Sequence, residues 1–522
     1  MSLSLLKDAA GILVPLLRDA QFTAAGIRRH LGPEATGALH RGEPAAVRRA
    51  TLDDSRLSFL VRFFLLHDEL PWERCLDALG AEACQSLRKA EALVACADRA
   101  RTTIDVYPHV LSGRDQWVFS DADASMIAHV PGPDHVLGVG AASISLLDSV
   151  PTSPVDSVLD LGTGSGVQAL GQIPYARRIT ATDVHPRALD FARATFRGAA
   201  TAEDAAFPEI EVRAGSWFEP VAGRVFDRII TNPPFVVGPP EVGHVYRDSG
   251  LALDGASRLI LSQAPRHLRR GGTAHAVAAW VHREGEAWQS RVASWLPSHG
   301  VAAWVLQRDV ADPALYVGTW LRDESLDPRG DEAAQRSEQW LDFFATESVT
   351  GVGFGFVALQ RLADDEPSEV IVEELSHDFQ DPLGPEVEEY FERSHWLRGL
   401  RGHEEVLSCR FVLRPGVARE RIGITDTATG MGFRPAVQRL SRTDGPRFSH
   451  EVDEHIAAIV AGLHPEGLSL GEVVRLYCAA QDLAAESILP EVAAAVVDLV
   501  RHGLLLPADL LAGGRTHGEE SR

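Results

Sequence analysis

The sequence predicts an α/β fold with an open, mostly parallel sheet. Mainly helical regions are expected before and after this sheet in the chain. Three segments predict the sheet. An apolar strand runs into a glycine-rich turn and a helix over residues 157–170, a second strand over 178–184 ends in an acid, and a third over 225–231 ends in a polar turn. Open α/β sheets place their chemistry at the carboxyl ends of their strands, so we expect a site there.

The first turn contains three glycines at alternate positions, Gly162, Gly164 and Gly166. Glycine lets the backbone turn tightly and approach a ligand closely. Asp160 lies two residues before the first glycine, whereas a dinucleotide site prefers the longer GxGxxG spacing and lacks this early carboxylate. The second strand ends in Asp183, 21 residues after Gly162. A carboxylate at that point can accept hydrogen bonds from both hydroxyls of a ribose.

The third turn reads Asn232-Pro233-Pro234-Phe235. Each proline ring fixes φ, and a residue that precedes proline is pushed to extended geometry, so the turn is rigid. The amide of Asn232 and a backbone carbonyl can then point into one cavity, with an aromatic ring beside them. Two acceptors and a flat stacking surface suit a planar substrate group that carries an NH or NH2.

Together these segments resemble the successive motifs of class I S-adenosylmethionine-dependent methyltransferases, over roughly residues 135–285. The Asn-Pro-Pro-aromatic turn is similar to that of the amino-methylating branch, which includes HemK/PrmC-type glutamine methyltransferases, RsmC-like ribosomal RNA guanine methyltransferases and adenine N6-methyltransferases. The resemblance implies a Rossmann-like sheet with an antiparallel last hairpin, and S-adenosylmethionine as cofactor. Phe235 replaces the Tyr common in glutamine and adenine enzymes, and Val236 replaces the His that often follows Phe in the guanine type. The acceptor therefore stays open.

The resemblance also implies the site residues. The glycine turn would hold the methionine part of the cofactor, Asp183 its ribose, and Ser216 would lie near its adenine. The expected cofactor-binding residues are Asp160, Gly162, Thr163, Gly164, Gly166, Asp183, Val184, Gly215, Ser216, Trp217 and Asn232. The expected catalytic residues are Asn232, Pro233, Pro234 and Phe235. Hydrogen bonds from a substrate NH2 to Asn232 Oδ1 and the Pro233 carbonyl would hold the nitrogen, and no metal is expected.

Three functions remain open at this stage. The first is an N-methyltransferase acting on a protein glutamine or on a small molecule with an amide or amine. The second is a methyltransferase for an exocyclic amine of an RNA or DNA base, in which the flanking regions would bind the nucleic acid. The third is a non-catalytic cofactor-binding protein. The intact motif residues Asp160, Asp183 and Asn232 argue against this role.

Composition limits the partners. The 522 residues carry a formal charge of −23, which argues against a broad surface that follows nucleic-acid phosphates. RNA stays open as a partner, whereas DNA is not expected and the oligomeric state is not indicated. Two arginine clusters are expected to be solvated helix ends: Arg266, Arg269 and Arg270, and Arg393, Arg398 and Arg401.

Targeting and metal signals are also lacking. The five cysteines have no metal-ligand or disulfide-framework spacing. The amino-terminal sequence lacks the regions of a signal peptide, and no apolar run reaches membrane length, so a cytoplasmic protein without a membrane partner is expected.

The chain divides into four expected regions. These are a helical, winged-helix-like domain over 1–130, the methyltransferase domain over 131–362, an α+β domain with a winged-helix-like tail over 363–512, and a disordered tail over 513–522. No basic recognition helix is evident in either flank, so protein docking or cofactor covering is expected there rather than DNA binding.

Particular elements are expected within these regions. In the first, a helix over 83–100 precedes two short strands over 102–108 and 116–120. After the core strands, 301–306 and 314–321 read as strands, 332–346 as a helix and 353–359 as a strand.

Overall fold

The computed structural model describes residues 3–123, 125–127, 132–202, 207–240, 248–323, 326–327, 329–375 and 382–514 of the 522. The chain forms two compact units. Unit 1 comprises Met1–Leu147 with Thr152–Glu373, and unit 2 comprises Asp148–Pro151 with Glu374–Arg522. Most of the regions expected at 1–130 and 131–362 therefore lie together in one unit.

The centre of unit 1 is a sheet whose order, within the described residues, is β13-β11-β12-β10-β9-β6-β7-β8. Strands β8, β7, β6, β9 and β10 run parallel, and β12 is antiparallel to both β10 and β11. The strands are β6 (Val155–Leu161), β7 (Ala176–Asp183), β8 (Glu209–Ala214), β9 (Phe226–Thr231), β10 (Leu268–Arg283), β11 (Val301–Ala311), β12 (Val349–Arg361) and β13 (Glu369–Glu374). The predicted mostly parallel sheet with an antiparallel last hairpin is confirmed.

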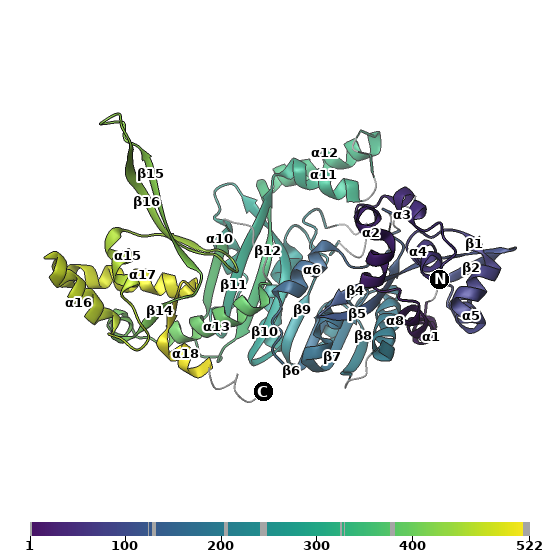
Figure 1. Ribbon diagram of the computed structural model, residues 1–522, viewed down its shortest axis with the longest axis horizontal. Coiled ribbons are helices and arrows are strands. Elements are labelled where there is room, and N and C mark those ends of the chain that lie inside the picture. The colour runs from purple at the N-terminus through teal and green to yellow at the C-terminus, as the bar shows by residue number, and fades with distance from the viewer. Residues whose placement is uncertain are drawn as a thin grey trace. The chain divides into compact units, whose positions relative to one another are not determined.

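Strand β6 lies in the middle of the parallel part, which brings the two predicted turns together. Leu161 at its end pairs with Thr182 of β7 on one side and Thr231 of β9 on the other. The carboxyl ends of all three strands therefore meet at one edge. Their apolar sequences suit burial on both faces of a parallel sheet. The nearby helices are α6 (Ala141–Ser149), α7 (Val167–Gln172), α8 (Pro186–Ala202) and α9 (Gly255–Gln263). Figure 1 shows α6 and α8 beside the parallel strands.

Two helices, α11 (Pro313–Asp323) and α12 (Asp331–Thr346), are inserted between β11 and β12. The expectation of a strand over 314–321 is wrong, because this segment belongs to α11. Asp312 Oδ1 accepts hydrogen bonds from the N–H groups of Ala314 and Leu315, at 2.9 and 3.0 Å. Such a capping side chain, followed by proline in the first turn, starts a helix.

The amino-terminal part of unit 1 is mainly helical, with a small sheet of order β1-β3-β2 and the separate hairpin β4-β5. The expected helix over 83–100 is wrong beyond Lys89, because Ala97 adopts a left-handed φ of 53° and turns β2 into β3. The expected pair of strands over 102–108 and 116–120 is confirmed as β4 and β5. The elements are α1 (Leu6–Asp19), α2 (Ala24–His40), α3 (Pro44–Ala50), α4 (Arg56–Phe64), β1 (Leu70–Pro71), α5 (Trp72–Lys89), β2 (Leu93–Cys96), β3 (Arg99–Thr102), β4 (Ile104–Leu111) and β5 (Arg114–Asp121).

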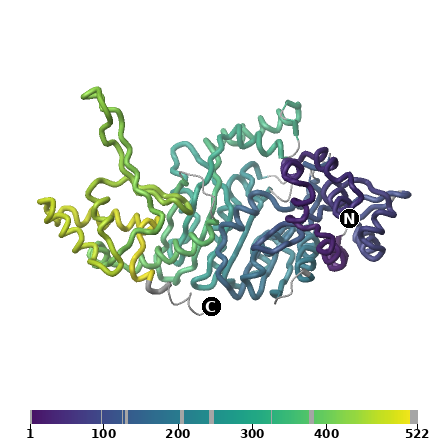
Figure 2. Tube along the Cα trace, viewed as in Figure 1, coloured from purple at the N-terminus to yellow at the C-terminus, as the bar shows by residue number. Residues whose placement is uncertain are grey.

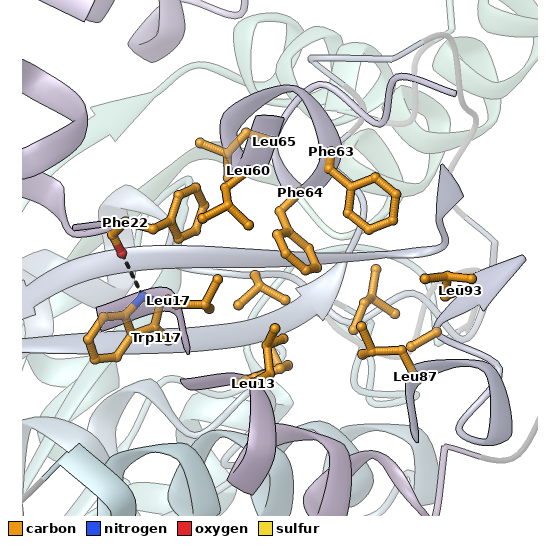
Figure 3. Close-up of a cluster of buried hydrophobic side chains, with 14 of the residues drawn as sticks. Leu13, Leu17, Phe22, Leu60, Phe63, Phe64, Leu65, Leu87, Leu93 and Trp117 are labelled. Atoms are coloured by element: carbon orange, nitrogen blue, oxygen red, sulfur yellow. Dashed lines mark hydrogen bonds between the residues drawn. The ribbon is translucent and has the colours of Figure 1, made fainter. Parts of the chain in front are cut away.

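A buried apolar cluster joins this helical part to the sheet region. Figure 3 shows it, with Trp117 Nε1 of β5 donating to the carbonyl of Phe22 at 2.8 Å. The same cluster includes Phe191 of α8, which is fully buried. Thr195 of α8 accepts a hydrogen bond from the N–H of Phe119 at 3.1 Å. The helical part is therefore packed against a helix that follows the Asp183 strand.

Unit 2 contains helices around a short strand pair and a long hairpin, β15-β16, which extends away from those helices (Figures 1 and 2). Gly513 and Gly514 end helix α18, and residues 515–522 of the expected disordered tail lie outside the described residues. The elements are α13 (Gly384–Arg398), α14 (His403–Ser408), β14 (Phe411–Leu413), β15 (Val417–Thr425), β16 (Phe433–Arg442), β17 (Ser449–Glu451), α15 (Glu454–Ala461), α16 (Leu470–Gln481), α17 (Ala485–Arg501), β18 (Leu505–Pro507) and α18 (Ala508–Gly514).

Arg393 of α13 is buried, so the expectation that it is part of a solvated arginine cluster is wrong. Its guanidinium pairs with Glu386 Oε1 at 2.5 Å, and Glu386 Oε2 pairs with Arg442 at 2.7 Å. A buried cation needs such a partner, because an unpaired charge in the interior is strongly destabilising. Glu386 therefore compensates the buried charges of Arg393 and Arg442.

Two features are absent from the part of the chain that the structure describes. No helix there is long and apolar enough to cross a membrane. No group of three or more His, Cys, Asp or Glu side chains there has the arrangement of a metal site.

Candidate active site

The glycine turn after β6 faces open space. Gly162 and Gly164 have left-handed φ values of 72° and 55°, and a Cβ added at either would meet no atom of the described residues within 4 Å. At Gly166 an added Cβ would lie 2.8 Å from the ring of Phe196 in α8. The first two glycines thus leave the backbone open to a ligand, whereas the third permits close packing of the turn on α8.

The buried side chain of Asp160 stabilises this turn through hydrogen bonds. Its Oδ2 accepts hydrogen bonds from Thr163 Oγ1 at 2.6 Å and from the N–H of Ala169 at 3.0 Å. Its Oδ1 is buried and has no hydrogen-bond partner among the described residues. Burial raises the pKa of Asp160 to about 7, and the nearby charge of Asp183 adds to the rise. One carboxylate oxygen is therefore left to accept a hydrogen bond from a cationic group.

Asp183 links the second strand to the glycine turn. Its Oδ2 accepts a hydrogen bond from the N–H of Gly164, and its Oδ1 accepts one from the N–H of His185, both at 2.9 Å. Burial raises the pKa of Asp183, and these backbone donors oppose the rise. Val184 beside it is 57% exposed. The acid thus lies half-buried at the edge of the site.

The segment after β8 lies next to Asp183. The N–H of Gly215 donates to the carbonyl of Asp183 at 3.0 Å, and Trp217 has a left-handed φ of 48°. A left-handed conformation is uncommon for an aromatic residue and indicates a tightly specified turn. The predicted residues Gly215, Ser216 and Trp217 are therefore brought to the same strand end as Asp183.

The turn at the end of β9 is tied to the glycine side of the site through Ser143 of α6. Asn232 Nδ2 donates to Ser143 Oγ at 3.2 Å, and Gln168 Nε2 donates to the carbonyl of Ser143 at 2.9 Å. Thr231 Oγ1 also donates to the carbonyl of Leu161 at 2.8 Å. The amide nitrogen of Asn232 faces Ser143, so Oδ1 is the atom that can accept a hydrogen bond on the other side.

The inserted helices hold the chain just after Phe235. Val237 donates its N–H to the hydroxyl of Tyr316 at 2.7 Å, and its carbonyl accepts a hydrogen bond from Trp340 Nε1 at 3.2 Å. Phe235 is partly buried against the same apolar cluster as these rings. We call Tyr316 and Trp340 the clamp.

Sequence reasoning missed the residues that support the site: Ser143, Gln168, Tyr316 and Trp340. Ser143 lies in a segment that approaches the core, but nothing in its residue type indicates the contact. Tyr316 was hidden by the incorrect expectation of a strand over 314–321.

The arginine cluster at Arg266, Arg269 and Arg270 lies at the opposite end of the parallel strands from the site. It surrounds the start of β10, which runs parallel to β9, whereas the site lies at the carboxyl end of β9. Arg269 pairs with Asp227 at 3.3 Å. This cluster therefore does not line the site.

The strand order, the glycine turn and the acid at the end of β7 define a class I S-adenosylmethionine-dependent methyltransferase domain. Residues 137–284 match the family model described as "Methyltransferase small domain", and this segment is such a domain. Residues 19–103 and 388–507 match two models described as domains of unknown function, DUF7059 and DUF7782.

Curated relatives cover the same segment. A release factor glutamine methyltransferase of Xylella fastidiosa is 38% identical over 127 residues, which is 22% of this chain and 44% of that protein. The ribosomal RNA small subunit methyltransferase C of Haemophilus influenzae is 33% identical over 156 residues, 29% of this chain and 41% of that protein. The chain thus spans less than half the length of these relatives.

Among solved structures, the chain is similar to the T. thermophilus 16S rRNA N2 G1207 methyltransferase (RsmC) in complex with AdoMet and guanosine. The sequences are 14% identical, the match covers 47% of this chain and 64% of that chain, and the TM-score is 0.26.

Proposed function

We propose that the protein is an N-methyltransferase that uses S-adenosylmethionine to methylate a planar amide or amino nitrogen, on a protein glutamine or a small molecule. One observation carries the choice of nitrogen. Because Asn232 Nδ2 donates to Ser143 Oγ at 3.2 Å, the amide oxygen is directed to accept a hydrogen bond, and a nitrogen that bears hydrogens can provide one.

The residues at the strand ends fit the cofactor. The open backbone at Gly162 and Gly164 leaves room for its methionine part, and the unpartnered Oδ1 of Asp160 can accept from its ammonium group. Asp183, at the end of the second strand, is the acid for its ribose. The remaining proposed cofactor contacts are Thr163, Gly166, Val184, Gly215, Ser216, Trp217 and Asn232.

The chemistry asked of the protein is positioning. The bound cofactor supplies a methyl group on a sulfonium, which is already activated. Asn232 Oδ1 and the Pro233 carbonyl would accept hydrogen bonds from the substrate nitrogen and draw its lone pair out of conjugation. Both acceptors stabilise the positive charge that develops on that nitrogen, which is the differential binding that catalysis needs. Phe235 would stack on the planar group, and Pro234 would keep the turn rigid.

A second candidate acceptor is the exocyclic amine of an RNA base. The relative named ribosomal RNA small subunit methyltransferase C supports it, as does the Phe that ends the turn at residue 235. The relative named release factor glutamine methyltransferase supports the protein acceptor.

Transfer of a labelled methyl group from the cofactor separates these candidates. The full chain is incubated with ribosomes, release factors or total RNA, and the label is followed into protein and RNA. We expect label in protein that is lost with Asn232→Ala. Label in RNA alone, also lost with Asn232→Ala, would replace the first candidate by the second.

A non-catalytic cofactor-binding role is tested separately. Calorimetry should detect binding of S-adenosylmethionine and a loss of affinity in Asp183→Ala. Unchanged binding in that variant would contradict the assignment of the site itself. Binding without transfer to any acceptor pool would favour the non-catalytic role.

The region before the core supports a proposed accessory role. Helix α4, strand β1, the two halves of α5 on either side of Gly80, and strands β2 and β3 follow one another in the order typical of a winged helix. We propose that residues 56–102 form such a module and that it covers the site or docks a protein partner. Deletion of this region should weaken binding of the acceptor if the module docks a protein partner, and binding of the cofactor if the module covers the site.

A further inference from the structure

The hairpin β15-β16 of unit 2 carries two different faces. Residues that pair directly across an antiparallel ladder point to the same side. Arg421 pairs with Gln438 and Thr425 with Phe433, so one side presents Arg419, Arg421, Gln438 and Phe433. We call this side the arginine face. The other side presents Glu420 opposite Arg439 and Ile422 opposite Val437.

The arginine face is positively charged within an acidic protein. Arg419 and Arg421 are the exposed arginines of this face, whereas Arg434 and Arg439 lie on the other side and Arg442 is buried against Glu386; the whole chain has a formal charge of −23. Of the two acids in residues 417–442, Glu420 lies on the other side, and Asp426 lies in the turn, where it accepts from Thr429 Oγ1 at 2.7 Å. Neither acid therefore neutralises the arginine face.

The arginines of this face are held in place by a neutral side chain. Arg419 Nη2 donates to Gln438 Oε1 at 2.6 Å, and Arg421 Nε donates to the same oxygen at 3.1 Å. Both side chains are exposed. One shared acceptor orders two guanidinium groups, and their remaining N–H groups face solvent on the same side of the hairpin.

An aromatic ring continues the row. Phe433 is 78% exposed, and a Cβ added at Gly423 would lie 3.1 Å from Phe433 Cβ. The ring thus lies beside Gly423, two residues along β15 from Arg421. Along a strand, alternate residues are spaced by about 7 Å. Arg419, Arg421 and the ring of Phe433 therefore form a line of two cations and one stacking surface.

We propose that the arginine face binds single-stranded RNA, with the two guanidinium groups on phosphates and Phe433 stacked on an unpaired base. Arginine forks match phosphate oxygens, and aromatic rings interleaved with cations are the means by which proteins bind unpaired strands. The Asp and Glu side chains of an acidic peptide would use the charges, but they supply no ring to stack on the exposed phenyl group. This binding does not depend on which nitrogen the methyl group reaches.

Binding of a labelled, unstructured RNA to the full chain, measured by anisotropy over a range of KCl concentrations, tests the proposal. We expect affinity that falls as salt rises. Arg419→Ala with Arg421→Ala should weaken binding and lower the slope of log Kd against log salt by about one to two. Phe433→Ala should weaken binding about tenfold with little change of slope, because stacking is not ionic.

Arg439→Ala is the matched control, because it removes one charge from the opposite side of the same hairpin, where Arg439 pairs with Glu451 at 2.9 Å. It should change the affinity for RNA by less than about twofold, since Arg439 lies on the side away from the arginine face and its charge is paired with Glu451. The proposal is overturned if the unmodified chain shows no salt-dependent binding of RNA, or if Arg439→Ala weakens binding as much as the double variant. Competition by polyglutamate at the same charge concentration as RNA would point to an acidic protein partner instead.

Discussion

Asn232 and Ser143 are separated by 89 positions in the chain, yet the amide nitrogen of Asn232 lies 3.2 Å from the hydroxyl oxygen of Ser143. The contact joins the turn proposed to hold the methyl acceptor to helix α6. Gln168, which follows the glycine turn, holds the carbonyl of the same serine at 2.9 Å. Ser143 is thus a structural link between the two halves of the proposed site.

Replacement of Ser143 by Ala should lower kcat about fivefold, because a single hydrogen bond contributes about 1 kcal/mol. The freed Asn232 amide could then rotate, and the methyl acceptor would be less well aligned. The affinity for S-adenosylmethionine should stay within about twofold. Steady-state kinetics and calorimetry measure the two effects. Ser294→Ala is the control, since that exposed hydroxyl donates to the carbonyl of Arg291 in α10 (Trp288–Ala293). Equal loss of activity in both variants would contradict the positioning role.

Tyr316→Phe should destabilise the protein and weaken use of the acceptor. The change leaves the N–H of Val237 buried without its acceptor at 2.7 Å, which costs about 1–3 kcal/mol. We expect a higher KM for the acceptor and a lower Tm, with unchanged binding of S-adenosylmethionine.

The matched control for the clamp is Tyr477→Phe in unit 2, where the hydroxyl lies 2.8 Å from Nδ1 of the exposed His455. It removes the same atom from a solvated position and should alter neither KM nor Tm. An unchanged acceptor KM in Tyr316→Phe, at full stability, would show that the clamp does not position the acceptor turn.

Gly162→Ala should weaken binding of S-adenosylmethionine at least tenfold. The left-handed φ of 72° makes a side chain unfavourable by about 1–2 kcal/mol, and the new methyl group would enter the open space in front of the turn. Gly113→Ala has nearly the same backbone cost, with φ of 75° and no atom within 4 Å in the part of the chain that the structure describes, but lies in the β4-β5 turn. Both variants should lose similar stability, and only Gly162→Ala should lose cofactor affinity.

Asp160 should make stability depend on pH. Burial raises the pKa of its carboxyl from an ordinary 3.8 to about 7. Between these values the folded protein binds a proton that the unfolded chain has released, so the free energy of unfolding falls as pH rises through this window and is constant above it. In Asp160→Asn this decline should disappear, and Tm at pH 8 should exceed that of the unmodified protein.

The same variant tests the role of Asp160 toward the cofactor. A cationic group at Oδ1 would favour the ionised carboxylate, so binding of S-adenosylmethionine near pH 6 should release protons. Calorimetry in buffers of different ionisation enthalpy measures that release. Persistence of the release in Asp160→Asn would assign it to another group.

How much of the site can be predicted from sequence depends on how local each feature is. The turn at Gly162–Gly166 and the acid at 183 are recognisable because neighbouring residues in the sequence determine the backbone conformations that they need. The antiparallel end of the sheet was expected from the resemblance, although its strand over 314–321 was not a strand. Asp312 and Pro313 start a helix there, and capping outweighed the apolar run that suggested a strand.

The sequence by itself determined the class of domain and the residues at its strand ends, because short motifs set backbone conformation locally. Only the tertiary structure brought Ser143 to Asn232, placed Tyr316 and Trp340 on Val237, and buried Arg393 against Glu386. These contacts join residues that are far apart in the chain, apart from the helical pair in α13. Their formation depends on how whole helices pack, and packing is not encoded in the spacing of any one segment.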